Sequence, residues 1–386
     1  VSEDENASLI AALISAFIPL IILETLNKIS VYSLALPVIF LMFYSFLRIK
    51  EKKFLILFII LSFILPLIHI SSIIFVITAL FYLILLFAEG KEINPIRSEA
   101  IIFSVLLIVL IEFLVYNRAF LAHGINFIGG NAPSALVKTY FTQFNIFEII
   151  YYTGTVPLIL GSFGIFYGAF KEKKRRVFLF SSIILSIILF LLFKLIDFTI
   201  AIMFSSLALT ILSSLALAKF FKYIDVTKFH SKKIDITIGI LALILIFSVI
   251  PSIFISRAVI ENSFSSGEIN VLEFIRDNTD EDVTVLANLE EGNLITAVAK
   301  RKNFIDKQFL LAPKLEQRLN DLYRMFTTAS EAQALDLFKE YNINIIYLST
   351  KSKKIFGING LRYIKNEKCF EKIKERGKAE AYRVIC

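Results

Sequence analysis

The sequence predicts a polytopic α-helical membrane domain followed by a small extracytoplasmic α/β domain. The chain is 57% hydrophobic, with a mean hydropathy of +0.74, whereas soluble domains are roughly 45–50% apolar. Its basic residues occur in short clusters between long apolar runs, a pattern typical of membrane topology. After Arg257 the long apolar runs give way to alternating strand and helix patterns, which are typical of an α/β domain.

The apolar runs predict about nine membrane spans, because about 20 apolar residues cross the hydrocarbon core of a bilayer. The third and fourth spans come from one run that is too long for a single span. Pro66 and His69 lie in its middle and predict a turn there. The expected spans are residues 7–23, 30–49, 54–68, 70–87, 99–116, 147–170, 177–193, 196–218 and 235–256.

The distribution of basic residues predicts the orientation of these spans. Of the 20 Lys and Arg residues before residue 257, 16 fall in the four loops 48–53, 88–98, 171–176 and 219–233. With nine crossings, these loops lie on the same side, and basic loops stay in the cytoplasm. The chain also opens with the acidic stretch VSEDENAS, so no cleavable signal peptide is expected. We therefore expect a multi-pass protein of the cell membrane.

The chain is expected to divide into a membrane domain, 1–256, and an extracytoplasmic α/β domain, 257–386. The longest break between apolar runs is the loop 117–146, which contains several Gly and polar residues. Such a segment cannot lie bare in hydrocarbon, because each unsatisfied backbone group there costs several kcal/mol. We expect it to be a large outer loop with room for a site.

The terminal domain reads as alternating helices and strands. The strand candidates are DVTVLANL, KNFIDKQF, INIIYLST and AEAYRVI, and Ser330 with Gln333 forms a capping box at the start of a helix. Cys369 and Cys386 match no metal-binding or redox spacing. A disulfide between them and a pair of free thiols are equally consistent with the sequence.

No local motif assigns a reaction. The sequence contains no phosphate-binding Gly-rich loop, no His-Glu-x-x-His and no nucleophile elbow. The basic clusters follow membrane topology, so membrane lipid is the expected partner and nucleic acid is not. Any chemistry must come from residues that the fold brings together.

Two acidic residues are the candidate catalytic groups. Glu24 ends the first span, and Glu112 lies within the fifth span near its outer end. Ionisable groups at membrane depth are costly and usually face protein or a watery cavity. The alternative is that such residues sit among lipid headgroups, and this applies to Glu24 and to Glu148 at the start of the sixth span.

Glu148 and several basic and polar residues near the outer face are the candidate groups for binding substrate or lipid phosphate. Arg118 and Lys138 could hold a phosphate, or Arg118 could merely extend to the interface. Asn131 lies in a Gly-Gly-Asn-Ala-Pro run that predicts a ligand loop or a simple turn. His69 is either a ligand or a hydrogen-bonded residue of its turn.

The order of these parts resembles the GT-C superfamily of lipid-linked-sugar glycosyltransferases, and in particular archaeal oligosaccharyltransferase catalytic subunits and their relatives. The stretches that carry the resemblance are 11–40, the segment from INFIGGN to the sixth span, and 285–309. The resemblance implies transfer of a sugar from a polyprenyl-phosphate-linked donor at the outer face, with divalent Mg or Mn as the metal. The acceptor stays unassigned.

The sequence also departs from that family. Where the family has Asp-x-Asp, this chain has only Glu24 and Asn27, and where it has Trp-Trp-Asp-Tyr-Gly, this chain has residues 288–292, NLEEG. The counterpart of the family's first catalytic loop would lie upstream of Val1. Protein glycosylation of a peptide acceptor is therefore not supported. Two alternatives stay open: a non-catalytic GT-C-scaffold protein of envelope or glycan assembly and, less favoured, a transporter or flippase.

Overall fold

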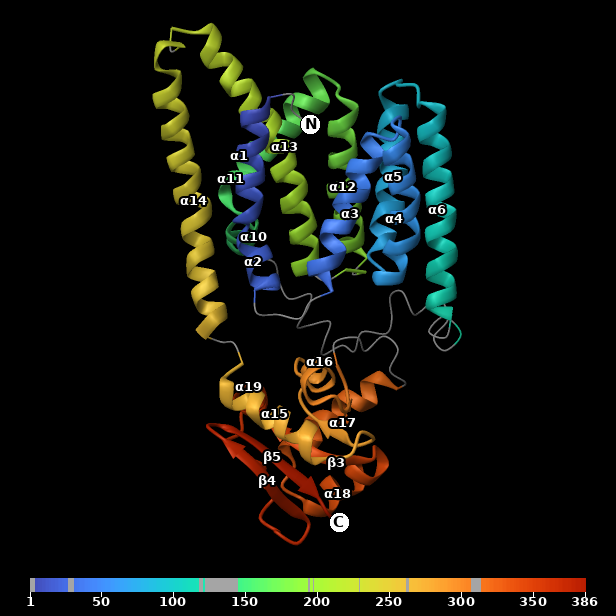
Figure 1. Cartoon of the computed structure of the whole chain (residues 1–386), viewed down its shortest axis with the longest axis vertical. Helices are drawn as coiled ribbons and strands as arrows, with labels where there is room; N and C mark the ends of the chain where they lie inside the picture. The colour runs from blue at the N-terminus through green and yellow to red at the C-terminus, as the bar shows by residue number, and fades with distance from the viewer. Residues whose placement is uncertain are drawn as a thin grey trace. The chain divides into compact units, whose positions relative to one another are not determined.

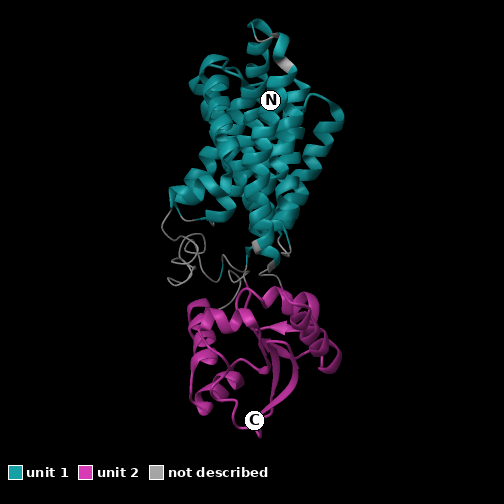
Figure 2. Ribbon diagram, turned by 90° about the vertical axis from the view of Figure 1, so that its left-hand side faces the viewer, with its two compact units in different colours: residues 1–129, 135–262 teal, residues 130–134, 263–386 magenta. Residues whose placement is uncertain are grey.

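The chain forms two compact units in a computed structural model that describes residues 4–26, 31–117, 121, 145–193, 195–196, 198–228, 230–261, 264–306 and 314–386. The helical unit contains the described residues up to Glu261, and the C-terminal unit contains those from Phe264 onward (Figure 2). The last helix of the first unit continues past residue 256, the end of the predicted membrane domain.

The helical unit is built from packed, mostly apolar helices that run up and down (Figure 1). Its helices are α1 (Glu5–Ala16), α2 (Pro19–Thr25), α3 (Tyr32–Leu47), α4 (Lys52–Ile68), α5 (Ser72–Ala88), α6 (Pro95–Val115), α10 (Ile146–Thr153), α11 (Thr155–Ile165), the π-helix η1 (Phe166–Lys171), α12 (Arg175–Leu192), α13 (Phe198–Val226), the 3₁₀-helix η2 (His230–Lys232) and α14 (Lys233–Glu261).

Among the described residues, four segments are long and apolar enough to cross a membrane: α6, α12, α13 and residues 234–257 of α14. Counting each of two bent helix pairs as one span raises the number to six. The nine predicted spans are therefore not confirmed. Helix α3 has 16 residues and α5 has 17. At about 1.5 Å per residue, such helices are shorter than the roughly 30 Å hydrocarbon core.

Two predicted spans are broken in the structure. The span predicted at 7–23 divides into α1 and α2, which meet at 48°, and Pro19 begins α2 where its missing N–H costs no helical hydrogen bond. The span predicted at 147–170 divides into α10 and the helix 155–171, bent by 89°. Gly154 lies at this bend with a φ of +84°, a backbone conformation that favours glycine.

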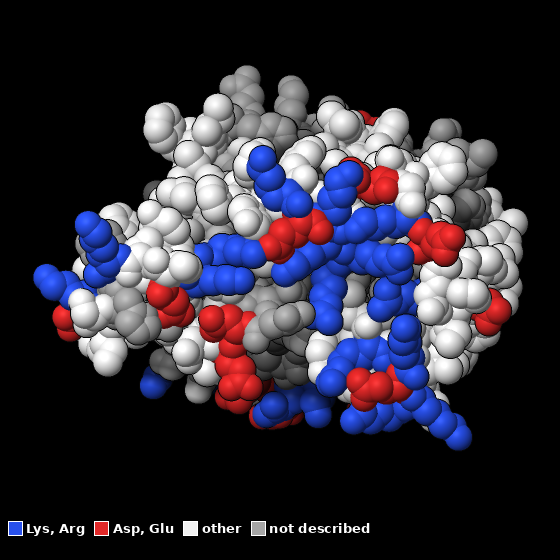
Figure 3. Space-filling model, turned by 90° about the horizontal axis from the view of Figure 1, so that it is seen from above, with Lys and Arg blue, Asp and Glu red and all other residues white. Residues whose placement is uncertain are grey.

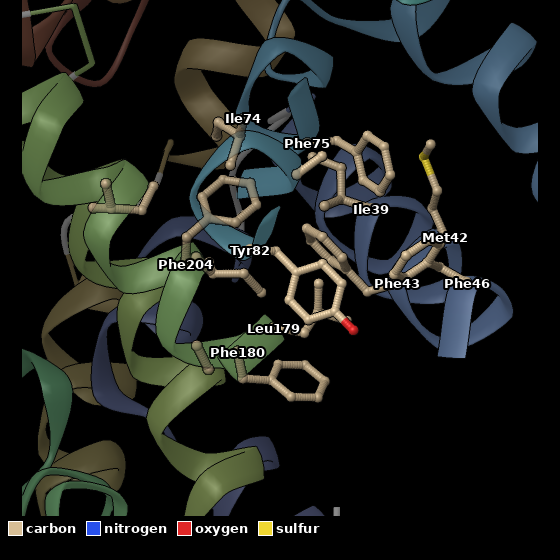
Figure 4. Packing of buried hydrophobic residues seen from close by; sticks show 14 of the residues in the cluster. Ile39, Met42, Phe43, Phe46, Ile74, Phe75, Tyr82, Leu179, Phe180 and Phe204 are labelled. Carbon is tan, nitrogen blue, oxygen red and sulfur yellow. The ribbon is translucent and has the colours of Figure 1, made fainter. Parts of the chain in front are cut away.

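Aromatic rings fill the core between α3, α4 and α5 (Figure 4). The ring of Phe75 lies 5.4 Å from that of Phe43 and 5.7 Å from that of Phe58. The rings of Phe46 and Tyr82 meet edge to face at 5.9 Å. Because lipid tails are as apolar as these side chains, close packing rather than burial from water holds the helices together.

Glycines bring α11 and η1 unusually close to α13. A Cβ atom on Gly164 would lie 2.1 Å from the carbonyl oxygen of Leu212, and one on Gly161 would lie 2.6 Å from that of Leu209. Real Cβ atoms do not approach backbone oxygens so closely. The two helices can therefore make this contact only with glycine at these positions.

Gly164→Ala is expected to destabilise the helical unit by about 1–3 kcal/mol, the usual cost of overpacking. The added methyl group meets backbone, which cannot move aside as a side chain could. Thermal unfolding of the full chain in detergent measures the effect. Gly239→Ala in α14 is the matched control, because no atom lies within 4 Å of its added Cβ. Equal unfolding temperatures for the two variants would contradict this account of the packing.

Lysine and arginine side chains gather at one end of the helical unit (Figure 3). Ion pairs connect the basic segments there: Lys173 Nζ lies 2.6 Å from Glu89 Oε2, and Lys219 pairs with Glu172. The guanidinium of Arg97 donates to the carbonyl of Leu47 at 3.2 Å. The basic loops that the sequence places on one side thus lie together.

The C-terminal unit is a five-stranded mixed sheet with helices on both faces. Strands β1, β2 and β3 pair in parallel and β3, β5 and β4 pair antiparallel, in the order β2-β1-β3-β5-β4. Its elements are α15 (Ser266–Asn278), β1 (Thr284–Leu286), α16 (Gly292–Leu294), η3 (Ile295–Ala299), β2 (Lys302–Asn303), α17 (Leu315–Thr327), α18 (Glu331–Glu340), β3 (Ile343–Leu348), α19 (Thr350–Phe356), β4 (Phe370–Arg376) and β5 (Ala379–Val384).

The two faces of this sheet carry separate apolar cores. Helix α15 and η3 cover one face, where Val271 and Ile295 pack against Val285 and Tyr347. Helices α17, α18 and α19 contribute to the core on the opposite face. The four predicted strands are present, and β4 is an additional one. Cys369 and Cys386 form a disulfide with a Cα–Cα distance of 4.8 Å, which resolves the alternatives that the sequence left open.

Candidate functional site

The end of α2 borders a small cavity in the helical unit. Its volume is about 100 Å³, and Glu24 is the one acidic residue among the described residues that line it. Glu24 is half-buried. The lining residues are Leu20, Leu23 and Glu24 from α2, Tyr152 from α10, and Phe198, Thr199 and Ile202 from α13. One acidic residue and two residues that carry hydroxyl groups therefore line a partly open space whose other lining residues are apolar.

The two helix bends position this cavity. Helix α2 has only seven residues after the bend at Pro19, and α10 has eight before the bend at Gly154. These two short helices pack against each other, and both contact α13. Because each helix pair is bent, the short helices α2 and α10 leave the direction of the helices before and after them, and Glu24 and Tyr152 line the same cavity.

Glu148 lies near the same site but outside the cavity lining. It occupies the first turn of α10 and is exposed, four residues before Tyr152. Residues four apart on a helix are neighbours on its surface, and the Tyr152 phenol is within electrostatic range of both Glu148 and Glu24. Tyr152 was not among the residues predicted from the sequence. Its spacing from Glu148 is the signal that could have indicated it.

Glu112 is buried in the last turn of α6, with 8% of its surface exposed. The hydroxyl of Ser72, the first residue of α5, donates to its Oε1. Among the described residues, Oε2 has no hydrogen-bond partner. The sequence identified the acid but not Ser72 as its partner, because 40 residues separate the two.

His69 ends α4 and is a hydrogen-bonded residue of its turn. Its Nδ1 accepts from the backbone N–H of Ser71 at 3.1 Å. The ring of Tyr32, at the start of α3, meets the imidazole edge to face at 4.9 Å. Of the two interpretations that the sequence allowed, this geometry fits the turn residue, and His69 is not among the residues that line the Glu24 cavity.

The structure thus separates the two candidate acids. Glu24 belongs to the cavity beside α10 and α13, whereas Glu112 contacts the start of α5 and is not part of that lining. Arg118, Asn131 and Lys138, the remaining predicted binding residues, lie outside the described residues. Within the described part of the chain, no group of three or more His, Cys, Asp or Glu residues could hold a metal ion. The described residues therefore provide no set of ligands for the divalent metal that the resemblance implies.

No protein-family model and no curated protein matches the chain. Among solved structures, it is similar to the apo oligosaccharyltransferase of Archaeoglobus fulgidus, with 14% identity and a TM-score of 0.42 over 96% of this chain and 52% of that one. It is also similar to archaeal oligosaccharyltransferase AglB from Archaeoglobus fulgidus in complex with an inhibitory peptide and a dolichol-phosphate. There the identity is 16% and the TM-score 0.41, over 82% of this chain and 45% of that one. The chain spans about half the length of these structures.

A third similar structure is the C-terminal globular domain of an oligosaccharyltransferase from the same organism. Its sequence is 15% identical, and the alignment covers 32% of this chain and 99% of that domain with a TM-score of 0.25. At these identities and scores, the similarities do not assign an activity to this chain.

Proposed function

We propose that the protein is a glycosyltransferase-like membrane protein that moves a sugar from a polyprenyl-phosphate-linked donor at the outer membrane face. The observation that carries the proposal is the cavity at Glu24, where this half-buried acidic residue lines a mostly apolar space together with Tyr152 and Thr199, which carry hydroxyl groups. The donor class follows from the sequence resemblance to lipid-linked-sugar glycosyltransferases. The apolar lining supports this class, because an isoprenoid lipid needs apolar contacts beside the reacting phosphate.

The proposed reaction needs a base for the acceptor. The acceptor oxygen forms a bond to C1 of the sugar as the C1–O bond to phosphate breaks, and the phosphate leaves with that electron pair. The carboxylate of Glu24 takes the proton from the acceptor hydroxyl, the ordinary role of a general base. Arg118 and Lys138 are the proposed cations for the leaving phosphate. No step is assigned to a metal ion.

The outer location is also a proposal. Two observations support it: the basic loops gather at one end of the helical unit (Figure 3), and α14 starts beside them and continues through a 24-residue apolar segment. A helix of that length crosses a bilayer, so the two ends of α14 would lie at opposite faces, which supports an outer location for the residues that follow it. The disulfide between Cys369 and Cys386 also favours an oxidising compartment.

Glu24→Gln is expected to lower sugar release from the lipid donor at least about 100-fold, the usual contribution of a general base. The full chain in liposomes is mixed with radiolabelled polyprenyl-phosphate mannose and, in parallel, with the glucosyl donor. Release of label from the lipid is measured, so that the identity of the acceptor does not limit the assay. Glu92→Gln removes an exposed acid from the α5–α6 connection and is expected to leave release unchanged. Release that is equal in the wild type and Glu24→Gln, or absent with both donors, contradicts the proposal.

A further inference from the structure

The C-terminal unit has a topological switch point at the carboxyl ends of β1 and β3. The two strands are parallel neighbours, so the residues that follow them meet at one edge of the sheet. After β1 the chain continues through α16 into η3, on the face that α15 covers. After β3 it continues into α19, which packs against α17 on the opposite face. Crevices at such points are the usual sites of function in open α/β sheets.

A network of buried polar side chains connects the two strand ends. Asn288, two residues after β1, donates from Nδ2 to the Ser352 hydroxyl at 2.9 Å. The hydroxyl of Ser349, the residue after β3, donates to the same oxygen at 3.2 Å. Ser352 in turn donates to Oε2 of Glu291 at 3.1 Å. Asn288, Glu291, Ser349 and Ser352 are at most 1% exposed, so the network is closed to water.

Glu291 is the incompletely satisfied member of this network. Its side chain is fully buried, and its Oε1 has no hydrogen-bond partner among the described residues. The hydroxyl of Tyr347, on β3, is likewise buried without a partner there. An ionised carboxylate in this place would hold a desolvated charge with half of its acceptor capacity unused, which costs several times more than a neutral group.

We propose that Glu291 is a pH-operated latch between the start of α16 and the start of α19. The latch is closed while Glu291 holds a proton, because a neutral carboxyl group tolerates the buried position. Ionisation favours the open form, in which the two helix starts separate and water reaches the carboxylate. Opening exposes the carboxyl ends of β1 and β3, so the proton controls access to this edge of the sheet.

The surrounding charges agree with this direction. The pKa of Glu291 is raised to about 7, and burial is the largest cause. The hydroxyls of Ser349 and Ser352 lower this pKa. The charge of Glu268 on α15 raises it, and that of Lys351 on α19 lowers it. Lys351 is half-exposed and also pairs with Glu290, which weakens its effect on Glu291. Burial likewise raises the pKa of Tyr347, so its phenol stays neutral across this pH range. Glu268 accepts from the backbone N–H groups of Ser265 and Thr350.

The sign follows from proton linkage. Closed Glu291 binds its proton with a pKa of about 7, whereas the solvated group in the open form has the ordinary value of 4.5. Below pH 4.5 both forms are protonated and the closed form has its full advantage. From pH 4.5 to 7 the opening equilibrium constant rises tenfold for each pH unit, about 300-fold in all, and then levels off.

Hydrogen–deuterium exchange of the full chain in detergent tests the latch. The reporters are the amides of Ser352 and Lys353, which are bonded to Ser349, and that of Ile295, which is bonded to Glu291. After correction for the intrinsic pH dependence of exchange, their protection is expected to fall about 300-fold between pH 4.5 and 7 and to stay level up to pH 8. A flat protection profile across this range overturns the proposal.

Three variants complete the test. Glu291→Gln is expected to abolish the pH dependence, whereas Glu290→Gln, which removes the neighbouring 40%-exposed acid, keeps it. Ser352→Ala removes the hydroxyl that donates to Oε2 of Glu291 and stabilises its ionised form, so the upper end of the transition is expected to move above pH 7. If Glu291→Gln fails to fold, the shift in Ser352→Ala still tests whether Glu291 is the titrating group. A transition that persists in Glu291→Gln, or that does not move in Ser352→Ala, assigns the titration to another group and overturns the proposal.

Discussion

Phe326→Ala is expected to lower the free energy of unfolding of the C-terminal unit by about 3–5 kcal/mol, the usual cost of deleting a buried phenylalanine ring. Phe326 is 1% exposed in the core on the α17 side of the sheet. Its ring stacks on that of Phe356 with a centroid distance of 4.3 Å and an interplanar angle of 8°. The truncation therefore leaves a cavity and also removes a ring-stacking contact between α17 and α19.

Urea titration of the full chain in detergent, followed by hydrogen exchange of the β3 amides, measures this loss within the C-terminal unit. Tyr323→Ala is the matched control, because Tyr323 lies one turn earlier on α17 and its ring also contacts that of Phe356, at 6.1 Å, but 59% of its surface is exposed. A loss of less than about 1 kcal/mol is expected for this surface substitution. Similar losses in the two variants would show that Phe326 does not belong to the core.

Removal of the disulfide between Cys369 and Cys386 is expected to lower the free energy of unfolding of the C-terminal unit by about 3 kcal/mol. The two cysteines are 17 residues apart, and a crosslink that closes a loop of this size restricts the unfolded chain by about that amount. The bond also ties the residue before β4 to the end of the chain after β5. Its loss frees both ends of the terminal hairpin.

The experiment compares urea unfolding of the full chain with and without reductant, and of Cys369→Ser with Cys386→Ser combined. Reductant is expected to lower the urea midpoint of unfolding of the wild type to that of the double variant. It is expected to leave the midpoint of the double variant unchanged. Maleimide labelling in intact cells gives a second readout, since oxidised cysteines do not react with it. An unfolding curve that reductant does not alter, or cysteines that react without reduction, would contradict the disulfide and its support for an oxidising compartment.

The sequence predicted secondary structure well where a pattern was local. The strands at 284–286, 302–303, 343–348 and 379–384 lie within predicted stretches, and each of these longer stretches carries apolar residues between turn signals. Strand β4, Phe370–Arg376, was missed, since charged residues occupy most of its positions and its pairing with β5 defines it. The bend at Gly154 was missed as well, because a single glycine in an apolar run does not reveal its φ.

The candidate site was predictable only in part. Glu24 and Glu112 stand out in sequence because acids are rare beside apolar runs. Their separation into two clusters depends on how α2, α6, α10 and α13 pack, which no local pattern contains. In the sequence, Glu291 stands out only as part of residues 288–292, NLEEG, where the chain departs from the family's motif. In sequence it reads as one of two acids before a glycine, and its burial arises from contacts with Ser352, 61 residues away.

The edges of the C-terminal sheet bear on how this unit avoids self-association. One edge strand, β2, has only two residues, and the other, β4, carries Glu371, Lys372, Lys374 and Glu375 and a register irregularity between Lys372 and Lys374. Short, charged or irregular edges prevent a second chain from adding its own strand to the sheet. The unit can therefore be held at high local density on a membrane without joining its neighbours into continuous sheets.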